Sequence, residues 1–263
     1  MQDIIFHIPH ASKNIPDEHL SDFKLNPEEL DHELLMMTDA YTDELFGSCG
    51  LPEDKIIEFP ASRLLVDVER FHNDSEEPMS QQGMGMIYVK THNGKDLRHN
   101  GNSRHKLFQK YYLPHHAKLE KAVSVGLSKA TKTLIIDCHS FPSKALPYEL
   151  DPAGNRPEIC IGTDKFHTPL KLANELYQLF KLKGFTVDYD TPFSGSLVPS
   201  TYYKKDARVR SVMIELRRDL TNSTKLFSEA APLLEIVGTV ILFKTLSFRI
   251  VALSFIYELS STL

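Results

Sequence analysis

The sequence predicts an α/β fold built on a mixed, mostly parallel central sheet with helices on both faces. Short apolar runs alternate along the chain with longer amphipathic segments, an order typical of parallel sheets whose crossovers are helices. Two of the runs, residues 4–8 and 133–136, are apolar almost throughout, as expected of strands buried on both faces. At 263 residues the chain is long enough for one large domain. We expect a single domain over residues 1–263, with an apolar C-terminal extension from about residue 239.

The first half of the chain supplies the first strands and one helix. A strand over residues 4–8 comes first. Asn26 is a plausible N-cap and Pro27 suits the first helical position, so a helix should begin there. Apolar residues at helical spacing carry this helix to Leu45 and place residues 38–39 on it or at a break within it. Two further strands are expected over residues 56–59 and 64–68.

The middle of the chain changes character. Residues 71–104 are rich in Gly, Asn, Ser, Met and His and show little periodicity beyond a short strand over 86–89. Loops of this length within a domain are usually lids or binding loops, or else disordered. Helical periodicity returns over about 102–129. The remaining elements are expected as strands ending at 137 and over 157–162, 186–189 and 209–216, with a helix over 169–183.

Charge and cysteine content limit the class of protein. Thirty Lys and Arg residues against 35 Asp and Glu give a net charge of -5. The basic residues are scattered, which disfavours nucleic-acid binding. Cys49, Cys138 and Cys160 cannot form a closed disulfide set and show no CxxC spacing, and the N-terminus has no basic region before an apolar core. We therefore expect a cytoplasmic protein.

The segment from Ile236 to Tyr257 is strongly apolar and has enough residues to cross a bilayer. Lys244 and Arg249 interrupt its middle. Each central charge costs roughly 2.5 to 3.5 kcal/mol for membrane insertion. We expect this segment to pack on the domain or to form a homo-oligomer contact rather than to span a membrane.

Each of the two buried strands is followed by a histidine at the same edge of the predicted sheet. These histidines are His10 and His139. Ligand sites of open α/β sheets lie beyond the carboxyl ends of the strands. A metal held between the two loops, Zn²⁺ or another divalent ion, is the leading hypothesis. The alternative is that each imidazole is a neutral, hydrogen-bonded packing group.

A catalytic zinc usually has three protein ligands, so a third is required. Asp39 is the favoured candidate, because a carboxylate within an apolar helical pattern is costly to bury without a partner. It and Asp43 could instead make hydrogen bonds on the helix surface. The other candidates for the third ligand are Asp43, His7, His92, His99 and His167.

Arginines flank the predicted strand over 64–68. Arg63 precedes it and Arg70 follows it. Guanidinium groups grip carboxylates in bidentate geometry, which indicates a small-molecule carboxylate substrate. A structural pairing of Arg70 with Asp67 or Asp137 is the alternative.

Glu215 ends an apolar strand pattern. A buried carboxylate must be paired, bound to metal or protonated, and a raised pKa suits a general base. The alternative for Glu215 is a salt bridge to Arg208, Arg217 or Arg218. In the loop over 71–104, three residues could close over a substrate or simply form a solvated surface. They are Tyr88, Lys90 and Arg98.

Five motifs in order resemble the N-formylglutamate amidohydrolase family over roughly residues 3–240. The motifs are Ile8-Pro9-His10-Ala11-Ser12, Thr38-Asp39 with Asp43-Glu44-Leu45, Ser62 to Arg70, Asp137-Cys138-His139-Ser140 and Ile214-Glu215-Leu216-Arg217. The resemblance implies a phosphorylase/hydrolase-like fold similar to zinc carboxypeptidases and aspartoacylases. It implies that His10 and His139 are metal ligands and that Glu215 is the general base. Arg63 and Arg70 would hold the substrate carboxylate or polarise its carbonyl, and Asp39 as third ligand is inferred from the Thr-Asp motif.

The implied reaction is metal-dependent hydrolysis of the N-formyl amide of an acidic amino acid, such as N-formyl-L-glutamate, to formate and glutamate in histidine degradation. The alternatives are a related amidohydrolase or carboxypeptidase-like enzyme, or a binding domain without metal. Two departures stand out. The His-x-x-Glu ligand pair of the peptidases is absent, since Lys13 stands at the Glu position, and Glu69 replaces the Asn that precedes the Arg in aspartoacylases.

Overall fold

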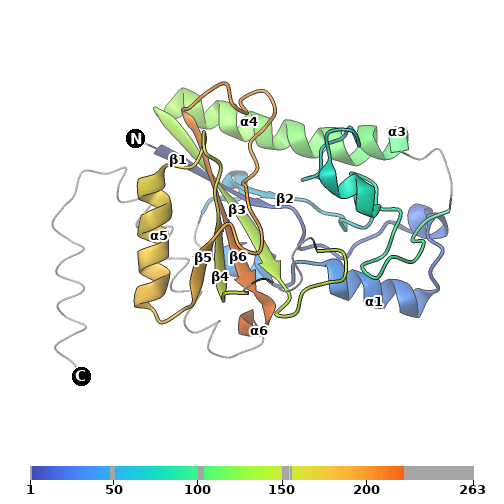
Figure 1. The fold of residues 1–263 in the computed structure, drawn as a ribbon. Helices are drawn as coiled ribbons and strands as arrows, with labels where there is room; N and C mark the ends of the chain where they lie inside the picture. Colours follow the sequence, from blue (N-terminus) through green and yellow to red (C-terminus); the bar gives the residue numbers. More distant parts are fainter. Residues whose placement is uncertain (1, 48–50, 100–103, 150–153, 155, 222–263) are drawn as a thin grey trace.

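A six-stranded sheet forms the centre of the protein (Figure 1). The computed structural model describes residues 2–47, 51–99, 104–149, 154 and 156–221. The strand order is β2-β1-β3-β6-β4-β5, and every neighbouring pair is parallel except β4 with β6. The strands are β1 Gln2–Ile8, β2 Ile56–Glu58, β3 Lys132–Phe141, β4 Ile159–Gly162, β5 Val187–Tyr189 and β6 Val209–Arg217. The predicted mixed, mostly parallel sheet is confirmed.

Helices cover both faces of the sheet, as predicted. The α-helices are α1 Pro27–Met37, α2 Thr42–Gly47, α3 Arg104–Leu107, α4 Leu113–Lys129, α5 Leu170–Leu182 and α6 Arg218–Thr221. A π-helical turn, Phe108–Tyr112, joins α3 to α4 into one continuous helical run. Short 3-10 helices lie at Asp17–Asp22, Glu53–Lys55 and Pro78–Gln82.

Alternation along the strands separates the two layers of core. Ile5 and Ile135 pack with Leu119 of α4 on one face. Their neighbours, including Phe6, pack with Phe46 of α2 and with α5 on the other. Because side chains alternate along a strand, odd-numbered positions of β1, β3 and β6 point to the α4 face. That face therefore receives the His, Asp and Glu side chains at the carboxyl ends of these strands.

The first predicted helix begins as expected and then breaks. Asn26 accepts a hydrogen bond from Glu29 N while the Glu29 side chain accepts one from Asn26 N, which is a complete capping box. The helix ends at Met37, since Thr38 is extended and Asp39 N donates to His10 O. Asp39 thus lies in a short connection beside the end of β1 rather than on a continuous helix.

The predicted strands over 64–68 and 86–89 are wrong. Residues 64–68 form buried turns, and the second segment contributes only an isolated bridge between Met84 and Tyr88. Arg98 supplies the reason, because its guanidinium donates to Leu64 O, Leu65 O and Tyr88 O at 2.8–3.1 Å. These carbonyl oxygens therefore have hydrogen-bond partners without a neighbouring strand. The apolar side chains of residues 64–68 pack into two separate core clusters.

Two further predictions concern the ends of elements. β3 continues past Asp137 to Phe141, so His139 lies within the strand rather than after it. The segment 236–257, with its expected packing or oligomer contact, lies outside the described residues. Within the described residues, no helix is both long and apolar enough to cross a membrane.

Candidate metal and catalytic site

The strand registers bring four ionisable residues together at the carboxyl edge of the sheet. His7 of β1 lies opposite Asp137 of β3, and His139 of β3 lies opposite Glu215 of β6. His10 follows β1 by two residues. All five are buried, with at most 6 % of the residue surface exposed. The sequence therefore concentrates charge in a part of the sheet that excludes most water.

His10 and His139 lie side by side, with ring centroids 5.2 Å apart. His10 Nε2 donates to Asp67 Oδ1 at 2.9 Å, which holds the ring in place. His10 Nδ1 is buried without a hydrogen-bond partner in the described residues. It lies 3.6 Å from Asp39 Oδ2 and 3.7 Å from Glu69 Oε2. A buried imidazole nitrogen with a free lone pair, backed by a carboxylate, fits a metal ligand.

Both nitrogens of His139 face carboxylates. Nδ1 donates to Asp39 Oδ2 at 2.9 Å, and Nε2 lies 3.2 Å from Glu69 Oε1. One atom each of His10, Glu69 and His139 lie within 4.8 Å of one another, a group that could hold a metal ion. Two imidazoles and one carboxylate match the protein ligands of a catalytic zinc. Sequence reasoning did not assign Glu69 as a ligand; its departure from the aspartoacylase pattern was the available signal.

The electrostatics of the two imidazoles favour a cation between them. Burial and Arg63 oppose protonation of His10, yet Asp67 and Asp39 raise its pKa. Burial likewise opposes protonation of His139, but Glu69 and Asp137 raise its pKa well above the ordinary value. Carboxylates that favour a bound proton also favour a bound metal ion in the same place.

Asp39, the expected third ligand, lies beside both imidazoles. Burial opposes its ionisation, but the nearby His10 and the hydrogen bond from His139 hold its pKa well below the usual range. It also lies 3.5 Å from Arg63 Nη1 and 3.6 Å from Arg218 Nη2. Asp39 is thus an ionised carboxylate next to the candidate ligands and already has two cationic neighbours.

The two arginines predicted to bind substrate differ in how they are engaged. Arg63 donates to Asp67 Oδ2 at 2.9 Å and to the Tyr88 hydroxyl at 3.1 Å, and Tyr88 in turn donates to Asp67 at 2.6 Å. Arg70 makes looser contacts, with Nε 3.5 Å from Asp67 and Nη1 3.8 Å from Glu77. Its side chain is 25 % exposed against 12 % for Arg63. Arg70 is the freer of the two for an incoming carboxylate.

Glu215 projects from β6 beside the imidazole pair. Its Oε2 atom is buried and has no hydrogen-bond partner in the described part of the chain. Burial raises the pKa of Glu215 to about 8, and the charges of Asp39 and Glu69 add to the shift. The arginines that sequence offered as partners make ion pairs with other carboxylates: Arg208 with Asp206, Arg217 with Asp219 and Arg218 with Asp39.

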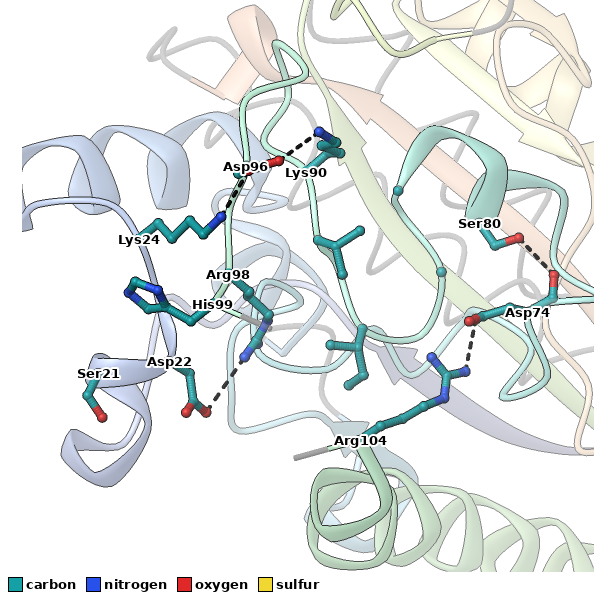
Figure 2. Close-up of a pocket in the computed structure, with 14 residues that line it drawn as sticks. Ser21, Asp22, Lys24, Asp74, Ser80, Lys90, Asp96, Arg98, His99 and Arg104 are labelled. Carbon is teal, nitrogen blue, oxygen red and sulfur yellow. Dashed lines mark hydrogen bonds and ion pairs between the residues drawn. The ribbon is translucent and has the colours of Figure 1, made fainter. Parts of the chain in front are cut away.

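Lys90 and Arg98 line a different pocket, of about 740 Å³, which none of His10, Asp39, Glu69 and His139 borders (Figure 2). Lys90 pairs there with Asp96, and Arg98 is 3.7 Å from Asp22. Tyr88, by contrast, points to Asp67 and the site. Of the five alternative ligands, only His7 lies at the site. Asp43 lies on α2, and His92 pairs with Glu33. His99 lines the pocket of Figure 2, and His167 bonds to Val209 O.

Comparisons with known proteins agree with this architecture. Residues 2–221 match a family model described as N-formylglutamate amidohydrolase. The fold is similar to the crystal structure of N-formylglutamate amidohydrolase from Ralstonia eutropha JMP134, with a TM-score of 0.74 and 18% identity over 90% of this chain and 92% of that one. It is also similar to gene product Atu2144 from Agrobacterium tumefaciens, with a TM-score of 0.68 and 19% identity over 92% and 91%. A search of curated proteins finds no match.

Proposed function

The chain belongs to the N-formylglutamate amidohydrolase family, and from this premise we propose that it is a metal-dependent hydrolase of the N-formyl amide of an acidic amino acid. N-formyl-L-glutamate is the first candidate substrate, with formate and glutamate as products. The observation that carries the proposal is the group of the buried His10 and His139 with Glu69, beside a Glu215 carboxyl whose Oε2 has no hydrogen-bond partner in the described residues. Two imidazoles, a carboxylate and a nearby base are the parts that metal-assisted hydrolysis requires.

The metal would be held by His10 and His139 together with a carboxylate. Glu69 is the carboxylate that the geometry favours, and Asp39 is the alternative from the Thr-Asp motif. When bound, a divalent cation supplies a Lewis acid that polarises the carbonyl and lowers the pKa of water. Asp67, on the far nitrogen of His10, would orient that ligand.

Glu215 would act as the general base. Its carboxyl lies opposite His139 in the sheet and would accept a proton from the attacking water. The same group would then return the proton to the departing amine, which leaves as the free amino acid. Burial keeps the carboxyl away from competing water, and the absence of a hydrogen-bond partner on Oε2 leaves an acceptor available.

Arg70 would bind a carboxylate of the substrate. Its Nε is buried without a hydrogen-bond partner in the described residues, and its nearest carboxylates lie at 3.5 Å and 3.8 Å. Arg63 would act mainly by holding Asp67 and Tyr88 in place. Arg70 would therefore bind the substrate, and Arg63 would position neighbouring side chains.

We expect the purified protein to release formate from N-formyl-L-glutamate and to lose this activity on treatment with a chelator. Added Zn²⁺ or another divalent ion should restore turnover. N-acetyl-L-glutamate, N-succinyl-L-glutamate and N-formyl-L-leucine serve as competing substrates that vary the acyl group and the side chain separately. Preference for another acyl group would identify a related amidohydrolase. Absence of turnover with all of them, with no metal retained, would indicate a binding domain instead.

Arg70→Lys should lower kcat/KM for an acidic substrate by about 10- to 100-fold, since a charge-assisted hydrogen bond to a carboxylate contributes about 1.5 to 3 kcal/mol. The loss should appear mainly in KM if the contact is equal in the ground and transition states. Arg217→Lys is the matched control, because Arg217 pairs with Asp219 outside the site. Equal KM values for the two variants would remove Arg70 from substrate binding.

A further inference from the structure

Glu69 belongs to two groups of metal-ligating side chains, in each of which its two partners are buried. Besides the group with His10 and His139, one atom each of His7, Glu69 and Asp137 lie within 4.8 Å of one another. The His7 and Asp137 side chains are 0% and 2% exposed. The second group is therefore as well shielded from solvent as the first.

The two carboxylate oxygens of Glu69 face different groups. Oε1 is 3.7 Å from His7 Nδ1, and Oε2 is 3.7 Å from His10 Nδ1. His139 Nε2 is 3.2 Å from each oxygen. A carboxylate whose oxygens point to two neighbouring ligand sets is arranged to bridge two cations.

The charges of Glu69 and Asp137 are compensated differently from those of their neighbours. Asp67 and Asp39 each lie within 4 Å of a guanidinium. In the described part of the chain, Glu69 and Asp137 make ion pairs only with imidazoles, among them His7 at 2.8 Å from Asp137 Oδ1. Carboxylates removed from water require a compensating positive charge, which a metal ion held between these side chains would supply in place of the proton on an imidazole.

The surroundings of His7 and Asp137 fit the role of ligands. His7 Nε2 lies 2.9 Å from His115 Nε2, and this hydrogen bond orients the His7 ring so that Nδ1 faces Asp137 Oδ1. Asp137 Oδ2 accepts a hydrogen bond from Leu197 N at 2.8 Å, which directs Oδ1 into the group. Metal binding would release the proton that His7 Nδ1 otherwise donates to Asp137.

We propose that this protein binds a second divalent cation between His7, Glu69 and Asp137, with Glu69 bridging it to the ion held by His10 and His139. The inference rests on the proposed function for the first ion. Mixed imidazole and carboxylate ligands suit Zn²⁺, Mn²⁺ or Co²⁺. In two-metal sites the ions lie about 3.5–4 Å apart and together stabilise the charges that develop in hydrolysis.

Zinc stoichiometry tests the second site. The full-length protein is freed of metal with a chelator, reloaded with Zn²⁺, passed through gel filtration and analysed for zinc per chain. We expect two ions for the unmodified protein and one for His7→Gln and Asp137→Asn. His116→Gln should keep both, because this neighbouring histidine of α4 bonds to Val68 O outside the group. In case a variant fails to fold, the unmodified protein loaded with Mn²⁺ should give a spin-coupled electron paramagnetic resonance signal.

The outcomes separate this inference from the proposed function. One zinc per chain with an uncoupled manganese signal would overturn the second site and leave the first intact. No retained zinc would overturn both. Two ions in the unmodified chain that are unaffected by His7→Gln and Asp137→Asn would place the second ion elsewhere and would also overturn the inference.

Discussion

His10→Ala and His139→Ala should each lower metal content by one ion per chain and reduce turnover by about 10³-fold or more. Each substitution removes one of the two imidazoles that would hold the ion, and the remaining ligands are too few to keep it against a chelator. A metal ion acting as a Lewis acid lowers the activation free energy by several kcal/mol. A change of about 4 kcal/mol in this barrier corresponds to a thousandfold change in rate. Elemental analysis after dialysis and a formate-release assay measure the two effects.

His92→Ala is the matched control for these variants. His92 was an alternative ligand by sequence, and in the structure it pairs with Glu33 away from the site. It should retain metal and turnover. Full metal content in His10→Ala or His139→Ala would remove that histidine from the ligand set.

Comparison of Glu69→Gln with Asp39→Asn would show which carboxylate is the third ligand. The geometry favours Glu69, so we expect Glu69→Gln to lose more metal than Asp39→Asn.

Local signals were sufficient to predict most of the sheet. The apolar run that becomes β3 and the Asn26 and Pro27 start of α1 depend on neighbouring residues alone, and both are confirmed. The expectation that His10, His139 and Glu215 meet at one edge followed from the parallel arrangement of strands, and the structure brings them together. Their chemical roles remain proposals.

Long-range contacts explain what the sequence did not predict. The apolar run over 64–68 looks like a strand, but Arg98, more than thirty residues away, binds its carbonyls. The orientation of Glu69 toward His10 and His139 depends on the same irregular segment. Asp137 and His7 could be placed on strands from sequence, but their pairing depends on the register between β1 and β3.

Glu215→Gln should lower turnover by roughly 10²-fold or more while leaving metal content unchanged, because glutamine keeps the shape of the side chain but cannot accept a proton. The buried Oε2 atom without a partner and the pKa raised by burial to about 8 both set this carboxyl apart from the ion-paired carboxylates around it. Formate release and zinc analysis on the same preparation measure the two quantities.

Glu44→Gln is the control for the substitution itself, since Glu44 lies exposed on α2, and it should change neither quantity. A role for Glu215 in stability rather than chemistry gives the opposite pattern, in which Glu215→Gln shows nearly normal turnover and a lower melting temperature. That result would assign proton transfer to another residue. Loss of both metal and turnover would instead make Glu215 a ligand, because a base that acts on water without binding the ion leaves metal affinity intact.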